Sequence, residues 1–323
     1  MKIGVFTVAL GNKTLDEACA FFKENGANAV EIGCGGFPGK SHCDPKVLLA
    51  DPQKLEEFKA TIARHDLVIS ALSCHANPVH PNKDMAKAFD EDLTDAILLA
   101  EKLGINIVNT FSGCPGDSDT SAHPNWVTCP WPEDFLTVLD YQWNAVLIPY
   151  WKEKVKFATA HGVDKIGLEM HPGFCVYNPE TLLKLRNAVG PEIGANFDPS
   201  HLVWQGIDPV EAIKILGKEK AIFHFHAKDT KIDKTNTAQN GVLDTKHYGN
   251  VMDRAWSFRS VGYGNDLSFW KDISSALRLV GYDHVMSIEH EDILMSQTDG
   301  LKRALECLKQ VVLVEPQGEM WWA

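Results

Sequence analysis

Long apolar runs are missing from this 323-residue sequence. No segment approaches the roughly 18 uninterrupted apolar residues that identify a membrane-spanning helix. The first residues, Met1 to Val8, are typical of a strand and lack the apolar core of a signal peptide. We therefore expect a cytoplasmic protein that does not act in a membrane.

Basic residues are scarce relative to acidic ones. The chain has 31 Lys and Arg against 43 Asp and Glu, which gives a formal net charge of −12. Proteins that bind nucleic acids rely on Lys and Arg to neutralise phosphates, so this balance disfavours nucleic acid as a partner. A local basic pocket for a phosphorylated sugar is still compatible with it.

Paired cysteines are absent as well. The eight cysteines are scattered, and none belongs to a Cys-x-x-Cys pair. Several stand within apolar segments, where reduced cysteines behave as small apolar side chains. This distribution favours reduced thiols over a disulfide framework.

The sequence does contain a regular alternation of strand-like and helix-like segments. Eight short apolar segments are each followed by a helical pattern, and the composition does not change along the chain. Such alternation predicts a single parallel α/β domain, and eight units close into a (β/α)8 TIM barrel. The predicted strands are 2–8, 29–34, 68–73, 105–111, 166–169, 193–198, 221–226 and 284–289.

Two long insertions and a short tail extend this barrel, which we place at residues 1–312. The insertions, 112–132 and 228–264, follow the fourth and seventh strands, and loops of such length are commonly functional. The tail, 313–323, carries two adjacent tryptophans. Because paired exposed tryptophans are unfavourable at a free end, we expect the tail to pack on the barrel or on a neighbouring subunit of a homo-oligomer.

Potential metal ligands stand at the ends of the last four predicted strands: Glu169, Asp198, His226 and Glu289. The active site of a TIM barrel lies at the C-terminal ends of its strands. One strand-end carboxylate is ordinarily a solvated rim residue, whereas four ligand-type residues on consecutive strands favour a metal site. Carboxylate and imidazole ligands suit Mn²⁺, Mg²⁺, Co²⁺ or Zn²⁺, and we expect one such ion, with Mn²⁺ as the first choice.

Further polar residues surround this set. His224 points the same way as His226, because side chains alternate along a strand, and we expect it one layer deeper. For His75 a structural role is equally compatible with the sequence, and for Arg259 a place on an ordinary surface loop. The residues that we expect to contact substrate are His75, His171, His201, Lys228 and Arg259.

This combination suggests proton transfer on a sugar. A divalent ion bound to two neighbouring sugar oxygens makes an adjacent C–H more acidic, and carboxylates on either side can remove a proton and return it elsewhere. Glu169 and Glu289 are the candidates for this acid/base pair. Lys228 and Arg259 would stabilise the enediolate oxygen.

Five motifs resemble those of the xylose isomerase-like barrels, a group of sugar phosphate isomerases and epimerases that includes tagatose 3-epimerase-like enzymes, inosose dehydratase and endonuclease IV. The motifs are Leu168-Glu-Met-His-Pro, Asn196-Phe-Asp-Pro-Ser-His-Leu, His224-Phe-His-Ala-Lys-Asp, Gly262-Tyr-Gly and Ser287-Ile-Glu-His-Glu-Asp. The resemblance implies that Glu169, Asp198, His226 and Glu289 hold the metal. It also implies that the two glutamates are the acid/base pair and that His201 contacts substrate.

We therefore expect a metal-dependent isomerase or epimerase of a sugar or sugar phosphate. The long insertions depart from compact ketose epimerases, so a lyase or dehydratase acting on a keto-sugar or inosose, including cleavage of a 3-keto-glycoside, is the alternative. The acidic charge disfavours a nuclease of the endonuclease IV type. A non-catalytic sugar-binding subunit is the remaining interpretation.

Overall fold

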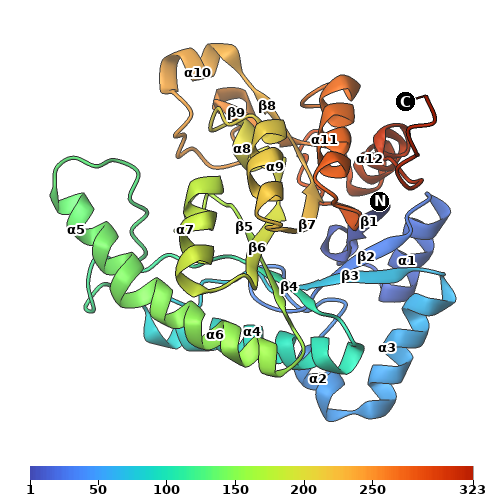
Figure 1. Ribbon diagram of the computed structural model, residues 1–323, viewed down its shortest axis with the longest axis horizontal. Coiled ribbons are helices and arrows are strands. Elements are labelled where there is room, and N and C mark those ends of the chain that lie inside the picture. The colour runs from blue at the N-terminus through green and yellow to red at the C-terminus, as the bar shows by residue number, and fades with distance from the viewer. Residues whose placement is uncertain (323) are drawn as a thin grey trace.

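Eight parallel strands form a closed barrel in the computed structural model, which describes residues 1–322 (Figure 1). Neighbouring strands follow the order β1-β10-β7-β6-β5-β4-β3-β2. The predicted single-domain (β/α)8 TIM barrel is thereby confirmed. The barrel strands are β1 (Lys2–Phe6), β2 (Ala29–Gly33), β3 (Val68–Ser73), β4 (Ile107–Thr110), β5 (Lys165–Glu169), β6 (Ile193–Phe197), β7 (Ile222–Ala227) and β10 (Val285–Ile288).

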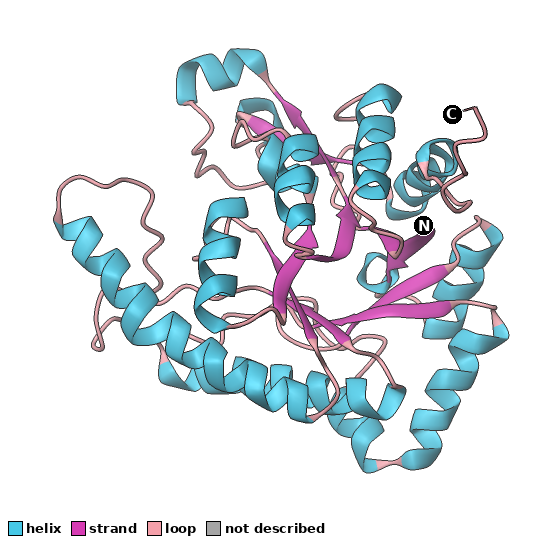
Figure 2. Ribbon diagram, in the orientation of Figure 1, coloured by secondary structure: helices cyan, strands magenta, loops and turns pink. Residues whose placement is uncertain are grey.

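Helices surround the barrel on its outside (Figure 2). Local sequence signals set their starts: Thr14 forms a capping box with Glu17 at α1, and Asn178 does so with Thr181 at α7. The outer layer consists of α1 (Leu15–Glu24), α2 (Pro45–Ala50), α3 (Pro52–Arg64), α4 (Lys83–Leu103), α5 (Asp134–Asp140), the π-helical η2 (Tyr141–Leu147), α6 (Ile148–Ala160), α7 (Pro179–Val189), α8 (Pro199–Val203), α9 (Pro209–Lys218), α11 (Leu267–Leu279) and α12 (Gln297–Val311).

The barrel strands are buried on both faces, as parallel strands covered by helices should be. All five residues of β2 and of β6 are buried. The helical layer contributes the largest fully buried side chains, Trp143, Trp151 and Trp270. Because apolar packing fills both layers, a charged side chain inside this barrel needs partners of its own.

The insertion after β7 contains regular structure that the sequence analysis did not predict. β8 (Asp229–Ile232) and β9 (Trp256–Arg259) pair antiparallel, with α10 (Lys234–Asn240) and the short 3-10 helix η3 (Val251–Asp253) between them. We call residues 229–259 the hairpin. Its Trp256 and Phe258 pack with Trp204 in an apolar cluster apart from the main core. Because the hairpin begins two residues after β7, it stands at the C-terminal end of the barrel.

The C-terminal tail is attached at its start and exposed at its end. The N-terminal amine donates a hydrogen bond of 2.9 Å to the carbonyl oxygen of Leu313, whereas Trp321 and Trp322 are 87% and 67% exposed. The tail end therefore does not pack on its own barrel here, and packing on a neighbouring subunit stays a prediction. In the described chain, none of the helices combines the length and the apolar character needed to cross a membrane.

Candidate metal centre

The four predicted ligands converge at the C-terminal end of the barrel. Glu169 is the last residue of β5, Asp198 follows β6, His226 lies in β7 and Glu289 follows β10. Each offers one ligand atom, and these four atoms lie within 4.8 Å of one another. The side chains of Glu169, Asp198 and His226 are at most 2% exposed, and that of Glu289 is 14% exposed.

The donor atoms are arranged as a divalent ion requires. His226 Nδ1 lies 3.1 Å from Glu289 Oε2 and 3.4 Å from Glu169 Oε2. His226 Nδ1 is buried without a hydrogen bond, and Asp198 Oδ2 is buried with only the charge of Lys228, whose Nζ is 3.1 Å away, to balance it. Ligand atoms at about 2.1 Å from one octahedral ion are themselves about 3 Å apart. The unpartnered nitrogen of His226, the spacing of the donor atoms and the oxygen-plus-imidazole chemistry all fit such an ion.

Glu31, in the middle of β2, is the site residue that the sequence analysis missed. It is fully buried and accepts hydrogen bonds from His226 Nε2 at 2.8 Å and from Ser287 Oγ at 2.7 Å. A proton on Nε2 leaves the Nδ1 lone pair free for a metal. The available signal was a charged residue inside an otherwise apolar strand, Ala-Val-Glu-Ile-Gly.

His224 lies one layer deeper than His226, as predicted. Its Nδ1 is 3.0 Å from Asn196 Oδ1 and its Nε2 is 3.0 Å from Ser70 Oγ. Burial, which outweighs the attraction of Glu31, lowers the pKa of His224 to about 3. His224 is therefore a neutral core histidine with both nitrogens partnered.

Two further histidines lie close to Glu169, each beside a different oxygen of its carboxylate. His201 Nε2 lies 2.9 Å from Glu169 Oε1, and His75 Nε2 lies 3.0 Å from Glu169 Oε2. Both histidine side chains are at most 4% exposed. The structure therefore brings the predicted residues His75 and His201 into the cluster, where His201 orients Glu169 through a hydrogen bond to Oε1.

Lys228 supplies the positive charge on the other side of the cluster. Its Nζ lies 2.6 Å from Glu289 Oε2, 3.1 Å from Asp198 Oδ2 and 3.1 Å from Glu291 Oε2. Burial works to lower the pKa of Lys228, but these carboxylates raise it well above its usual value. Lys228 is a buried ammonium group that faces the same carboxylates as the candidate ion.

Arg259 does not reach the cluster. Its Nε donates to Asp292 Oδ2 at 3.0 Å. Successive side chains of a strand point to opposite faces, and Phe258 occupies the inner face of β9: the Lys228 ammonium lies 4.7 Å from its ring centre. Phe258 is thus a site residue that the sequence analysis missed, and the enediolate contact predicted for Arg259 has no geometric support.

The charges of the cluster explain the pKa values of its members. Burial raises the pKa of Asp198 to about 7, against the opposing attraction of Lys228. Burial also works to raise the pKa of Glu289, but Lys228 and His226 outweigh it and bring the value to about 2. Burial works to lower the pKa of His226, yet Glu31 and Glu289 raise it well above its usual value. Several buried carboxylates with few cations are an arrangement that a divalent ion stabilises.

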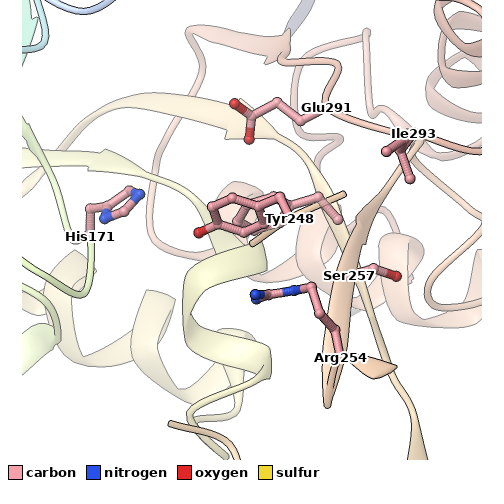
Figure 3. A pocket seen from close by; sticks show the side chains of 7 residues that line it. His171, Tyr248, Arg254, Ser257, Glu291 and Ile293 are labelled. Atoms are coloured by element: carbon pink, nitrogen blue, oxygen red, sulfur yellow. The ribbon is translucent and has the colours of Figure 1, made fainter. Parts of the chain in front are cut away.

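Two cavities share Glu291, which lies beside this cluster. One, of about 300 Å³, is lined by apolar residues such as Phe37 and Phe111 and also by Glu169 and Glu289. The other, of about 270 Å³, lies under the hairpin. Figure 3 shows Glu291 and His171 on the barrel side of this second cavity, opposite Tyr248 and Arg254. His171, predicted to contact substrate, therefore lies at the rim and faces a cavity.

Comparisons with known proteins agree with this architecture. A family model described as a xylose isomerase-like TIM barrel matches residues 19–311. The uncharacterized protein YfiH of Bacillus subtilis is 40% identical over 315 residues, which span 97% of this chain and 99% of that protein.

Solved structures with the same fold cover nearly the whole chain. The probable 3-DHS dehydratase AsbF from Bacillus anthracis is 19% identical with a TM-score of 0.65, over 96% of this chain and 99% of its own. A D-tagatose 3-epimerase-like protein is 23% identical with a TM-score of 0.63, over 96% and 98%. The IolI protein with a bound zinc atom is 19% identical with a TM-score of 0.64, over 97% and 98%. This chain belongs to the xylose isomerase-like TIM barrel family.

Proposed function

We propose that the protein is a divalent-metal-dependent isomerase or epimerase of a sugar or sugar phosphate, with Glu169 and Glu289 as its acid/base pair. The observation that supports this proposal most strongly is their placement. Both carboxylates belong to the four-residue ligand cluster, and both line the same cavity of about 300 Å³. That cavity is large enough for one sugar ring.

Different residues have different roles in the proposed proton transfer. A bound divalent ion would hold two neighbouring sugar oxygens and acidify the adjacent C–H. Glu169, oriented by His201, accepts or returns a proton on one side of the sugar, and Glu289 does so on the other. The Lys228 ammonium, 2.6 Å from Glu289 Oε2, stabilises negative charge that develops on the enediolate oxygen.

The metal is proposed to be Mn²⁺ first, with Mg²⁺, Co²⁺ and Zn²⁺ as alternatives. Three carboxylates and one imidazole suit each of these ions. The zinc atom in the IolI structure supports keeping Zn²⁺ in this set. The proposed partner is a small sugar molecule, with neither nucleic acid nor a membrane involved.

A lyase or dehydratase acting on a keto-sugar or inosose is the second candidate. The observation that favours it is the position of Lys228, whose ammonium lies 3.1 Å from Glu291 Oε2 and 2.6 Å from Glu289 Oε2. Glu289 lines the barrel cavity, and Glu291 lines both this cavity and the one under the hairpin. An ammonium in contact with both glutamates would supply the proton for an oxygen that leaves after the C–H proton is removed.

Proton exchange in D₂O, followed by NMR over ketoses and keto-sugars, tests both candidates. Deuterium gain at one carbon with the carbon skeleton retained supports the isomerase or epimerase, whereas loss of water or of an aglycone supports the lyase. Glu169→Gln and Glu289→Gln should each reduce the exchange rate by at least about 100-fold. Full exchange in both variants would sink the proposed acid/base pair.

A further inference from the structure

A third cavity, of about 300 Å³, lies between the loop after β4 and the hairpin. Its walls include four aromatic residues, Trp126, Trp204, Tyr248 and Trp256. The rings of Trp204 and Trp256 are stacked, with centres 4.6 Å apart and planes 6° apart. Flat aromatic walls with a few polar groups are characteristic of small-molecule sites. The proton-transfer mechanism above does not use this cavity.

Two indole N–H groups of this cavity have no hydrogen-bond acceptor. Trp126 Nε1 and Trp204 Nε1 are both buried and unpartnered among the described residues. Other buried tryptophans do find acceptors: Trp151 Nε1 donates to Ser112 O and Trp256 Nε1 to Val242 O, both at 2.9 Å. A buried donor without an acceptor costs about 1–3 kcal/mol. Both donors belong to residues that line this cavity, and an oxygen of a bound ligand would give them an acceptor.

The cavity is connected to the proposed reaction site through two histidines. His201 lines it and also lies 2.9 Å from Glu169 Oε1. His171 lines both this cavity and the cavity under the hairpin, where Figure 3 shows it facing Tyr248 and Arg254. The rings of His171 and His201 are 4.1 Å apart. The barrel cavity shares Glu291 with the cavity under the hairpin, and that cavity shares His171 and Tyr248 with the aromatic one. A molecule that reacts at Glu169 can therefore extend through this series of cavities to the aromatic walls.

The charges around the cavity suit a neutral ring better than a phosphate. Its lining contains no Lys or Arg, and its one carboxylate, Asp244, already accepts from the backbone amide of Ala255 at 2.7 Å. A phosphate would need cations or several free amides. A pyranose ring instead offers C–H groups to an aromatic face and hydroxyl oxygens to indole N–H donors.

We propose that Trp126, Trp204, Trp256 and Tyr248 form a second sugar subsite, which holds a glycosyl ring attached to the sugar that reacts at Glu169 and Glu289. This inference rests on the proposed function. It restricts the substrate class to disaccharides or glycosides, because a single ring in the barrel cavity leaves the aromatic cavity empty.

Titration calorimetry on the Mn²⁺-loaded protein tests the subsite with sugars that share one reacting unit. The probes are free fructose and its glycosides lactulose, maltulose and isomaltulose, which differ in linkage. At least one disaccharide should bind 10-fold or more tightly than fructose. Trp126→Ala should remove most of this advantage and leave fructose binding unchanged. Trp126→Phe and Trp204→Phe, which keep a ring and delete the donor, should each weaken disaccharide binding about 3- to 10-fold.

Trp321→Ala, the same replacement on the exposed tail, is the control and should change neither affinity. Equal affinity for fructose and all three disaccharides overturns the subsite, as does absence of disaccharide binding. A disaccharide advantage that survives Trp126→Ala and Trp204→Phe overturns it too. A third result separates the two proposals. If the variants abolish a preference for disaccharides but no sugar exchanges protons in D₂O, the subsite is supported and the isomerase or epimerase is rejected.

Discussion

His226 uses its two ring nitrogens for different purposes. Nε2 contacts Glu31 at 2.8 Å, whereas Nδ1 faces Glu169 and Glu289 without a hydrogen bond. Carboxylate partners of metal-binding histidines fix the tautomer and the ring orientation. We therefore propose that Glu31 is a positioning residue, which would act on a bound metal through His226.

Replacement of Glu31 should weaken metal binding without removing a ligand. Glu31→Gln no longer provides a carboxylate to the Nε2 proton, so we expect affinity for Mn²⁺ to fall about 10- to 100-fold. Competition with a chelating dye measures this affinity. Glu56→Gln, on the exposed face of α3, is the matched control and should bind Mn²⁺ like the parent. Unchanged affinity in Glu31→Gln would show that Glu31 serves only the fold.

At the residue scale, the sequence predicted the four residues of the cluster better than their surroundings. Glu169, Asp198, His226 and Glu289 could be identified because each stands at the end of an apolar segment. Glu31 lies on β2, far from these strands in the sequence, and its partnership with His226 depends on barrel closure. The inward side of β9 could not be chosen without knowing that β8 pairs with it, so Phe258 was overlooked and Arg259 was selected instead.

At the element scale, one buried carboxylate holds the hairpin to the chain that follows it. Asp229 Oδ2 accepts from the backbone amides of Gly262, Gly264 and Asn265, each at 3.0 Å, and from Trp270 Nε1 at 3.2 Å. These bonds connect the start of β8 to the N-terminal part of α11. The aromatic cavity depends on this connection because the hairpin provides one of its walls.

Loss of the Asp229 carboxylate should destabilise the whole connection. Asp229→Ala leaves several buried N–H donors without an acceptor, so we expect a loss of roughly 3 kcal/mol or more in the free energy of unfolding. Urea denaturation followed by circular dichroism measures it. Asp233→Ala, which removes the exposed N-cap of α10, should cost only about 1 kcal/mol. Equal losses in the two variants would contradict this role for Asp229.

The sequence predicted the strands of the barrel but not the two strands of the hairpin. The barrel strands could be predicted because burial on both faces makes them apolar throughout. The sequence of β8 is Asp-Thr-Lys-Ile and that of β9 is Trp-Ser-Phe-Arg. Each has four residues and mixes polar with apolar side chains, so neither is a continuous apolar run. Their pairing joins residues separated by the whole of α10 and η3, and such long-range pairing leaves no local pattern.

At the scale of the whole molecule, the exposed tail is the feature that the single chain does not explain. Met320, Trp321 and Trp322 are 67%, 87% and 67% exposed. Exposure of large apolar side chains next to one another favours a contact with another molecule. A second copy of the chain is the proposed partner.

Deletion of residues 318–323 should therefore lower the apparent size of the protein. We expect size-exclusion chromatography with light scattering to show an oligomer for the full chain and a smaller species for the truncated one. The same mass for both proteins would contradict a role of the tail in assembly. A circular dichroism spectrum of each protein checks that the barrel itself is intact.

The central claim is a single divalent metal held by Glu169, Asp198, His226 and Glu289, and metal analysis tests it most directly. Asp198 and Asp208 both cap a helix and both precede a proline, but only Asp198 lies in the cluster. We predict about one equivalent of Mn, Mg, Co or Zn in the parent and in Asp208→Ala, and almost none in Asp198→Ala. About three equivalents of zinc would favour a nuclease instead. No metal in the parent, with none taken up on addition, would contradict the account.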